Sequence, residues 1–204
     1  GKTTATDLAA AILSDTGPCQ QTREYNALDS VIRLLLSTGR ADRYCIAELA
    51  ATGPGTLDLS VRVFNPDVAV ITLIGRDHYS AFKNMEAIAA EKEKVVSALP
   101  PGGTAVLNID DPLVRRIGER CTRRVIWFGE GEGADLRLIE ARSCWPEPLT
   151  LRVAVGSEIY EVRTQLHGVH MATPVLAALG VALAEDIPLD KAITALKHVQ
   201  PPDG

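Results

Sequence analysis

The sequence predicts an α/β fold in which helices flank a mostly parallel sheet. Short β-branched runs such as residues 68–73 are apolar throughout, as strands covered on both faces are. Segments of helical length and pattern alternate with these runs, which indicates β-α-β units. Residues 1–4, Gly-Lys-Thr-Thr, form the second half of a phosphate-binding loop directly before a helical pattern, so the P-loop type of sheet is expected.

Composition supports one globular domain and argues against two classes of function. The 204 residues are 46% hydrophobic and 23% charged, which supplies enough apolar material for a core. A net charge of −5 disfavours nucleic-acid binding, which needs a basic face. The sequence lacks an apolar run of the roughly 20 residues that a transmembrane helix requires. Its four cysteines form no C-x-x-C pair, so we expect reduced, buried thiols in a cytoplasmic protein.

Helices and strands are expected to alternate in the first half of the chain. Residues 3–13 place apolar side chains on one helical face, and residues 44–48 are a short apolar run that ends in a glutamate. Residues 57–64 have a helical pattern, and a turn separates them from the strand 68–73. A further helix is expected over 84–99, before a Pro-Pro-Gly-Gly break.

The second half continues this alternation and then changes character. A strand over 104–107, a helix over 112–121 and a strand over 124–128 complete the parallel part. Alternating polar and apolar residues then predict antiparallel strands within residues 135–163. These strands are expected over 136–139, 149–155 and 159–162, and two helices over 172–184 and 189–196 follow them.

Residues 1–4 carry the chemistry of a phosphate site. Gly1 allows close backbone approach, N–H groups at a helix N-terminus point at an anion, and Lys2 reaches the β- and γ-phosphates. Thr3 would bind Mg²⁺ through its hydroxyl. The same four residues also arise by chance in loops that bind nothing. Because a strand has to lead into such a loop, we expect the residues that complete it upstream of Gly1.

Glu48 and His78 are expected at the same edge of the sheet as this loop. Glu48 ends one predicted strand, and His78 follows the next central strand. Ligands of parallel α/β sheets bind where the carboxyl ends of the strands meet. A carboxylate and an imidazole beside phosphates suit Mg²⁺ ligation or the orientation of a ligand. The alternative is a solvated glutamate and a helix-capping histidine.

Lys92, Asn108 and His170 are further candidates, each with a structural alternative. The residues three and four positions from Lys92 are apolar, so its amine is expected to face the sheet; alternatively its stem covers apolar surface and the amine reaches solvent. Asn108 ends a predicted strand, whereas Asp111 before Pro112 is explained as a helix N-cap. His170 precedes a long apolar helix, where a capping or packed ring is the favoured interpretation.

Taken in order, these motifs resemble the central domain of the Mur ligase family. The resemblance covers almost the whole chain, and residues 48–59 look most like the branch that adds D-alanyl-D-alanine. We therefore expect residues 1–204 to be one such domain of a longer, three-domain chain. The matching segments are residues 1–4, 48–50, 65–75 with His78, 86–92, 106–111, 168–178 and 201–204.

The resemblance implies an ATP-dependent ligase that forms amide bonds in cell-wall (peptidoglycan) precursors or related molecules. In that family a substrate carboxylate attacks the γ-phosphate to give an acyl phosphate and ADP, and an amine then displaces phosphate. The partners would be nucleotide, a carboxylate and an amine substrate, with a UDP-linked peptide as a candidate, and flanking N- and C-terminal domains. Neither nucleic acid nor membrane would be bound.

The family's site residues map onto this sequence one by one. Lys2, Lys92 and His78 would be catalytic, and Lys92 matches a family lysine that is often carbamylated. Nucleotide contacts would come from Gly1, Lys2, Thr3, Thr4, Asn108 and His170, and Mg²⁺ ligands from Thr3, Glu48 and His78.

Two departures keep other functions open. Met171 and Pro174 stand where the family has asparagines that contact adenine, and neither can donate an amide hydrogen bond. A Mur-like module that binds nucleotide or a partner without ligating, or a ligase of another pathway, is therefore an alternative. An unrelated P-loop kinase or hydrolase is a third, and would leave His78 and Lys92 far from the phosphates.

Overall fold

The computed structural model describes residues 1–22, 28–76 and 79–200. Within them the elements in chain order are α1 (Lys2–Ser14), β1 (Cys19–Gln21), α2 (Leu28–Ser37), β2 (Tyr44–Ile46), α3 (Thr56–Phe64), β3 (Val68–Ile71), α4 (Tyr79–Phe82), α5 (Met85–Ser97), β4 (Thr104–Asn108), α6 (Pro112–Arg120), β5 (Arg124–Gly129), β6 (Leu136–Cys144), β7 (Glu147–Val155), β8 (Glu158–Arg163), the 3₁₀ turn η1 (Val169–Met171), α7 (Ala172–Ala184) and α8 (Leu189–Leu196).

The larger sheet has the order β3-β4-β5-β6-β7-β8. Its first four strands are parallel, and β7 and β8 add to them in antiparallel sense. A second, two-stranded sheet pairs β1 with β2 in parallel. The predicted fold class is therefore confirmed, including the antiparallel addition.

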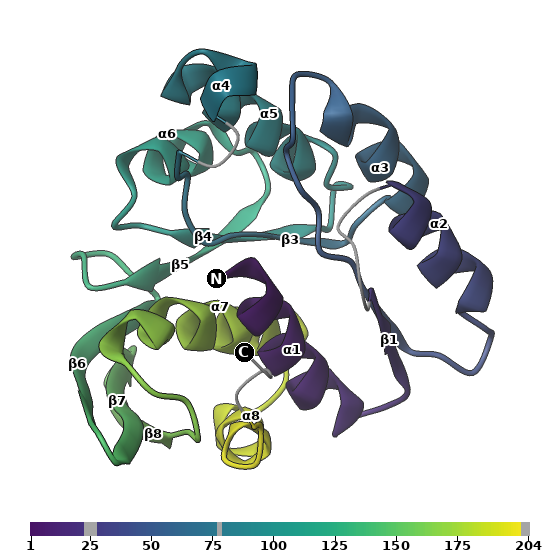
Figure 1. The fold of residues 1–204 in the computed structure, drawn as a ribbon. Helices are drawn as coiled ribbons and strands as arrows, with labels where there is room; N and C mark the ends of the chain where they lie inside the picture. Colours follow the sequence, from purple (N-terminus) through teal and green to yellow (C-terminus); the bar gives the residue numbers. More distant parts are fainter. Residues whose placement is uncertain (23–27, 77–78, 201–204) are drawn as a thin grey trace.

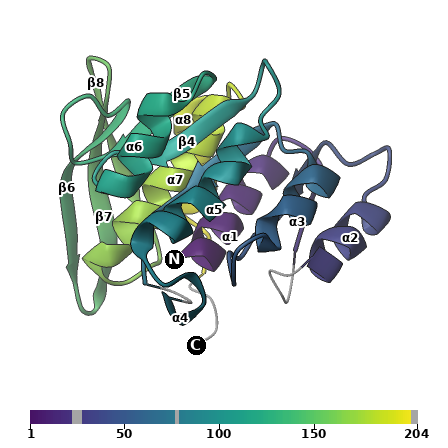
Figure 2. The same ribbon diagram turned by 90° about the horizontal axis from the view of Figure 1, so that it is seen from above.

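Helices cover both faces of the parallel strands (Figure 1). On one face α7 packs against β3, β4 and β5, and α1 packs on α7. On the other face α5 packs against β3 and α6 against β4. Successive residues of β4 serve opposite cores: Val106 belongs to the core under α7, and Ala105 and Leu107 belong to the core under α5 and α6. Figure 2 looks onto the layer of α5 and α6, with β4 and β5 behind these helices.

Helix α7 is buried on nearly all sides, which its apolar sequence predicts. A Cβ at Gly180 would clash with Cγ1 of Val106, so the glycine allows α7 to approach β4 closely. Pro174 is the third residue of the helix, where its missing N–H has no partner within the helix in any case.

Several elements differ from the sequence-based expectation. β1, α2, α4 and η1 were not anticipated. β1 is a three-residue, half-buried strand with two glutamines and so has no apolar pattern. The strand expected over 136–139 continues to Cys144. Its second half contains exposed polar residues without an alternating apolar pattern, and pairing with β7 stabilises it as a strand. The four cysteines are free thiols, as expected, but they are not buried: Cys19, Cys45 and Cys121 are half-buried and Cys144 is exposed.

A buried carboxylate fixes α3 against α5. Glu91 is only 4% exposed, and its carboxylate accepts hydrogen bonds from the backbone N–H groups of Gly55 (2.9 Å) and Leu57 (2.8 Å) at the start of α3. Lys94 lies 2.9 Å from the same carboxylate. Burial alone would raise the pKa of Glu91, but the Lys94 ammonium and these two N–H groups together lower it below its ordinary value.

We predict that Glu91→Gln destabilises the domain by about 2 kcal/mol at pH 7, because one amide NH₂ then faces a backbone N–H in a buried site. Since the pKa of Glu91 is lowered in the folded state, its carboxylate stabilises the fold above pH 4.5 and loses this effect as the pH falls further. Urea unfolding at pH 7 and pH 4 measures both effects. Glu93→Gln, at an exposed ion pair with Arg120, is the control and should change stability by less than about 1 kcal/mol.

Candidate active site

Helix α1 presents its amino end at the edge of the sheet. Gly1 is its N-cap and makes no side-chain cap, while the N–H of Ala5 donates to the carbonyl of Gly1 at 3.1 Å. The N–H groups of the first turn therefore have no acceptor within the helix, and the helix dipole makes this end positive. Lys2 is half-buried and Thr3 is exposed there, whereas Thr4 is 5% exposed and turns inward. The arrangement suits an anion such as a phosphate.

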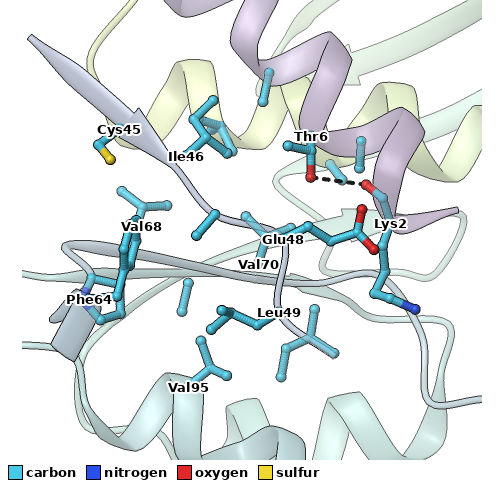
Figure 3. Close-up of a pocket in the computed structure, with 18 of the residues that line it drawn as sticks. Lys2, Thr6, Cys45, Ile46, Glu48, Leu49, Phe64, Val68, Val70 and Val95 are labelled. Carbon is cyan, nitrogen blue, oxygen red and sulfur yellow. Dashed lines mark hydrogen bonds between the residues drawn. The ribbon is translucent and has the colours of Figure 1, made fainter. Parts of the chain in front are cut away.

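A cavity of about 420 Å³ opens beside this helix end, between β2 and β3. Its walls are largely apolar, and its polar lining includes Lys2, Glu48 and Lys92. Figure 3 shows the side chains of Lys2 and Glu48 next to each other at the end of the cavity where β2 gives way to a loop. The structure thus brings the predicted phosphate lysine and the predicted metal carboxylate together.

One further acidic residue, Asp7, lies near Glu48 on this side of α1. The N–H of Glu48 donates to Oγ1 of Thr22 at 3.0 Å, and Nε2 of Gln21 donates to Oδ1 of Asp7 at 3.4 Å. Burial raises the pKa of Asp7, the Gln21 hydrogen bond lowers it, and the negative charge of Glu48 raises it again; the net shift is upward. Asp7 was not among the predicted site residues, although it lies only five residues after Lys2, within two turns of the same helix.

Three side chains form hydrogen bonds with the backbone of three consecutive residues directly after β3. Nδ2 of Asn108 donates to the carbonyl of Thr72 at 2.8 Å, and Nζ of Lys92 donates to the carbonyl of Leu73 at 2.9 Å. The N–H of Ile74 donates to Oδ2 of Asp111 at 2.7 Å. We call this set the β3-end clamp. It fixes the path of the chain at the edge of the sheet.

The clamp bears on several sequence-based predictions. Lys92 faces the sheet as expected, because its amine reaches the end of β3. Asn108 is buried and uses its amide within the protein, since its Oδ1 also accepts from the N–H of Asp110, so a nucleotide contact from this residue stays a prediction. Asp111 is an N-cap, accepting from the N–H groups of Leu113 and Val114, and in addition it holds Ile74.

Of the two remaining candidates, only His170 lies within the described residues. His78 lies outside the described residues. His170 is exposed on η1, before α7, and is not part of the described cavity lining. Across residues 1–22, 28–76 and 79–200, no three His, Cys, Asp or Glu side chains gather as a metal site. A helix long and apolar enough to cross a membrane is likewise not found among these residues.

We predict that Asp111→Asn releases Ile74 and leaves α6 capped, because an asparagine oxygen still accepts from Leu113 and Val114 while its NH₂ faces the Ile74 N–H. A hydrogen bond to a charged acceptor contributes about 1.4 kcal/mol or more to stability. Its loss should therefore speed the exchange of the Ile74 amide at least about tenfold. Amide hydrogen exchange by NMR measures this.

Asp110→Asn is the matched control for this variant. Asp110 holds the N–H groups of Glu130 and Gly131 instead, at 2.8 Å each, so its substitution should leave Ile74 protected. Unchanged Ile74 exchange in Asp111→Asn would show that the clamp does not depend on this carboxylate.

Comparison with known proteins identifies relatives of this chain. The family profile of the Mur ligase middle domain matches residues 1–182. The UDP-N-acetylmuramoyl-tripeptide–D-alanyl-D-alanine ligase of Mycobacterium tuberculosis is 28% identical over 98% of this chain and 40% of its own length. The Synechocystis enzyme of the same name is 31% identical over 93% of this chain and 39% of its own length. The chain thus spans well under half the length of these relatives.

Solved structures agree with the sequence relatives. MurF from Acinetobacter baumannii superposes with a TM-score of 0.92 at 27% identity, over all of this chain and 45% of that one. MurF from Thermotoga maritima, solved in complex with ADP, has a TM-score of 0.88 at 23% identity over 100% of this chain and 47% of that one, and so shares the fold. The expected resemblance, including that to the D-alanyl-D-alanine-adding branch, is confirmed. This chain belongs to the Mur ligase family, as a divergent middle domain related to MurF.

Proposed function

We propose that this chain is the ATP-binding domain of an ATP-dependent ligase that joins a carboxylate to an amine in cell-wall precursor synthesis. The observation that carries the proposal is the meeting of Lys2 and Glu48 at the amino end of α1, beside a cavity in a member of the Mur ligase family. A metal-bound triphosphate needs N–H groups and a lysine to bind its phosphates and a carboxylate to bind its metal ion, and this helix end offers all three.

The nucleotide would bind through this helix end. Backbone N–H groups of the first turn and the ammonium of Lys2 would hold the β- and γ-phosphates. Lys2 would thereby offset the repulsion between the phosphates and an approaching carboxylate. Thr4, which turns inward, would contribute through its backbone only.

Mg²⁺ fits the donor chemistry of this edge, because Thr3 and Glu48 offer a hydroxyl and a carboxylate oxygen, the ligands that this ion prefers. Thr3 and Glu48 would hold one ion and His78 would serve a second. When bound, the ions would supply positive charge against the phosphate oxygens. The charge of Asp7, close to Glu48, would add to the negative field of this side.

The proposed reaction has two steps. An oxygen of the substrate carboxylate attacks the γ-phosphorus, the bond from that phosphorus to the β-γ bridging oxygen breaks, and ADP leaves. The amine then attacks the acyl carbon of the acyl phosphate, loses a proton and releases phosphate. Lys92, whose amine donates to the carbonyl of Leu73, matches the family lysine that is often carbamylated, and its anionic carbamate would stand near the second Mg²⁺ in place of a carboxylate.

The whole protein would need further domains for this reaction. Because the relatives are more than twice as long as this chain, we propose that flanking N- and C-terminal domains bind the carboxylate and amine substrates, a UDP-linked peptide being a candidate. The isolated domain would then be inactive, and the enzyme would act in the cytoplasm without nucleic acid.

A second candidate is a module that binds nucleotide without ligating. The observation that favours it lies at the start of α7, where Met171 is half-buried and Pro174 is buried. Neither side chain can hydrogen-bond an adenine edge, so a weakened or altered base contact is expected. Calorimetry with ATP and Mg²⁺ on the full-length protein separates the two, because binding without ADP release in the presence of candidate substrates supports the module.

We predict that Lys2→Ala in the full-length protein lowers ATP-dependent amide formation at least about a hundredfold, since one electrostatic contact to the transferring phosphoryl group contributes this much or more. Lys191→Ala, on the exposed side of α8, is the control and should retain activity. ADP release coupled to product, followed by chromatography, is the measurement. Retained turnover in Lys2→Ala would refute the role of this helix end.

A further inference from the structure

We propose that Asp111 is a positioning residue for Lys92, acting through the peptide group that joins Leu73 to Ile74. The carboxylate would hold one end of this peptide group, so that the other end holds the Lys92 amine at the wall of the cavity. The inference rests on the proposed function in one respect, because it gives Asp111 a part in the reaction through Lys92. The contacts that carry it lie within the domain itself.

A single peptide group lies between the two charged side chains. Its N–H, on Ile74, donates to Oδ2 of Asp111 at 2.7 Å, and its carbonyl, on Leu73, accepts from Nζ of Lys92 at 2.9 Å. The group is planar and trans, so its N–H and its carbonyl point in opposite directions. A rotation of this peptide group would therefore break both contacts at once. Nζ also keeps a hydrogen as a carbamate, so the same carbonyl can accept from either form of Lys92.

The charges of the two side chains suit the two ends of the peptide group. A peptide group is negative at its oxygen and positive at its hydrogen, so the ammonium of Lys92 and the carboxylate of Asp111 each face the end of opposite sign. Hydrogen bonds in such a chain strengthen one another by polarisation. Loss of the negative charge of Asp111 should therefore weaken the contact between the carbonyl and Lys92, even where the shape of the side chain is kept.

Asp111 is itself fixed well enough to act as an anchor. Its Oδ1 accepts from the N–H groups of Leu113 and Val114 at 2.9 and 3.1 Å, and its own carbonyl accepts from the N–H of Arg115 at 2.8 Å. These contacts cap α6, which packs against α5, the helix that carries Lys92. The cap of α6 therefore also fixes the end of β3.

Asp111 lies behind the cavity wall rather than in it. Lys92 and Leu73 line the cavity, whereas Asp111 is not among the described residues of its lining. Ile74 is 5% exposed and belongs to the core under α5 and α6. We therefore expect Asp111 to make no contact with a nucleotide in this cavity, and its effect on the reaction to pass through Lys92.

Asp111→Asn in the full-length protein tests the proposal, because it removes the charge and keeps an oxygen that caps α6. A crystal structure of the variant without nucleotide should show Nζ of Lys92 more than about 3.5 Å from the carbonyl of Leu73, beyond hydrogen-bond distance. The kcat of ATP-dependent amide formation should fall at least about tenfold, since a misplacement of about 1 Å at a reaction centre can cost about a hundredfold. The Kd of ATP, measured by calorimetry, should stay within about twofold of that of the wild type.

Two further variants separate positioning from a loss of charge or of folding. Asp111→Ser keeps a good N-cap but is too short to reach Ile74, so it should have the same three effects and decides the question if Asp111→Asn fails to fold. Asp110→Asn makes the same change of charge one residue earlier, where the carboxylate holds the loop after β5. This control should keep both the Lys92 contact and kcat.

Four results would overturn the proposal. Lys92 on the Leu73 carbonyl in both Asp111 variants would show that the peptide group does not depend on the carboxylate. Full kcat in a variant that has lost the contact would show that the reaction does not need it. Weakened ATP binding with unchanged kcat would place Asp111 in nucleotide binding, and an equal loss in Asp110→Asn would assign the effect to charge alone.

Failure of the proposed function can be told apart from failure of this inference. A wild-type protein that forms no amide bond would refute the proposed function. The ligand-free crystal structures of the variants would still decide whether Asp111 positions Lys92.

Discussion

The amino end of α1 and the carboxyl ends of β2 and β3 lie at the same edge of the molecule, and the site depends on this geometry. Crossover helices of a parallel sheet begin where their strands end, so backbone N–H groups and loop side chains meet there. Lys2 comes from the helix, Glu48 from the loop after β2, and Lys92 reaches the end of β3 from α5. Lys2 and Glu48 are 46 positions apart in the chain, and Glu48 and Lys92 are 44 apart, yet all three line one cavity.

Polar contacts, some exposed and some buried, help apolar packing to keep this edge in place. The β3-end clamp holds Thr72, Leu73 and Ile74 by side chains from β4, α5 and the start of α6. Glu91 does the same for the start of α3. A carboxylate that accepts two or more backbone hydrogen bonds fixes a loop more firmly than a contact between methyl groups, since any other position leaves a charge or an N–H group unpaired. The loops that border the cavity are therefore organised before a ligand arrives.

Periodicity in the sequence predicts those elements that pack against the core. The apolar strands over 68–71 and 104–108 and the apolar helix α7 could be predicted because burial alone dictates their residues. β1 could not, since three half-buried residues show no pattern, and the far half of β6 could not, since pairing with β7 stabilises it. In the site, Lys2, Glu48 and Lys92 were found by residue type and order. The hold of Asp111 on Ile74 and the proximity of Asp7 to Glu48 arise from tertiary contacts that no local spacing encodes.

The central claim is that the amino end of α1, with Lys2 and Glu48, binds the phosphates of a nucleotide. A crystal structure of the full-length protein with a non-hydrolysable ATP analogue and Mg²⁺ tests it most directly. We expect the β- and γ-phosphate oxygens within hydrogen-bond distance of the N–H groups and the amine at residues 1–4, with Mg²⁺ contacting Thr3 and Glu48. Phosphates bound elsewhere, with this helix end facing only solvent, would contradict the account.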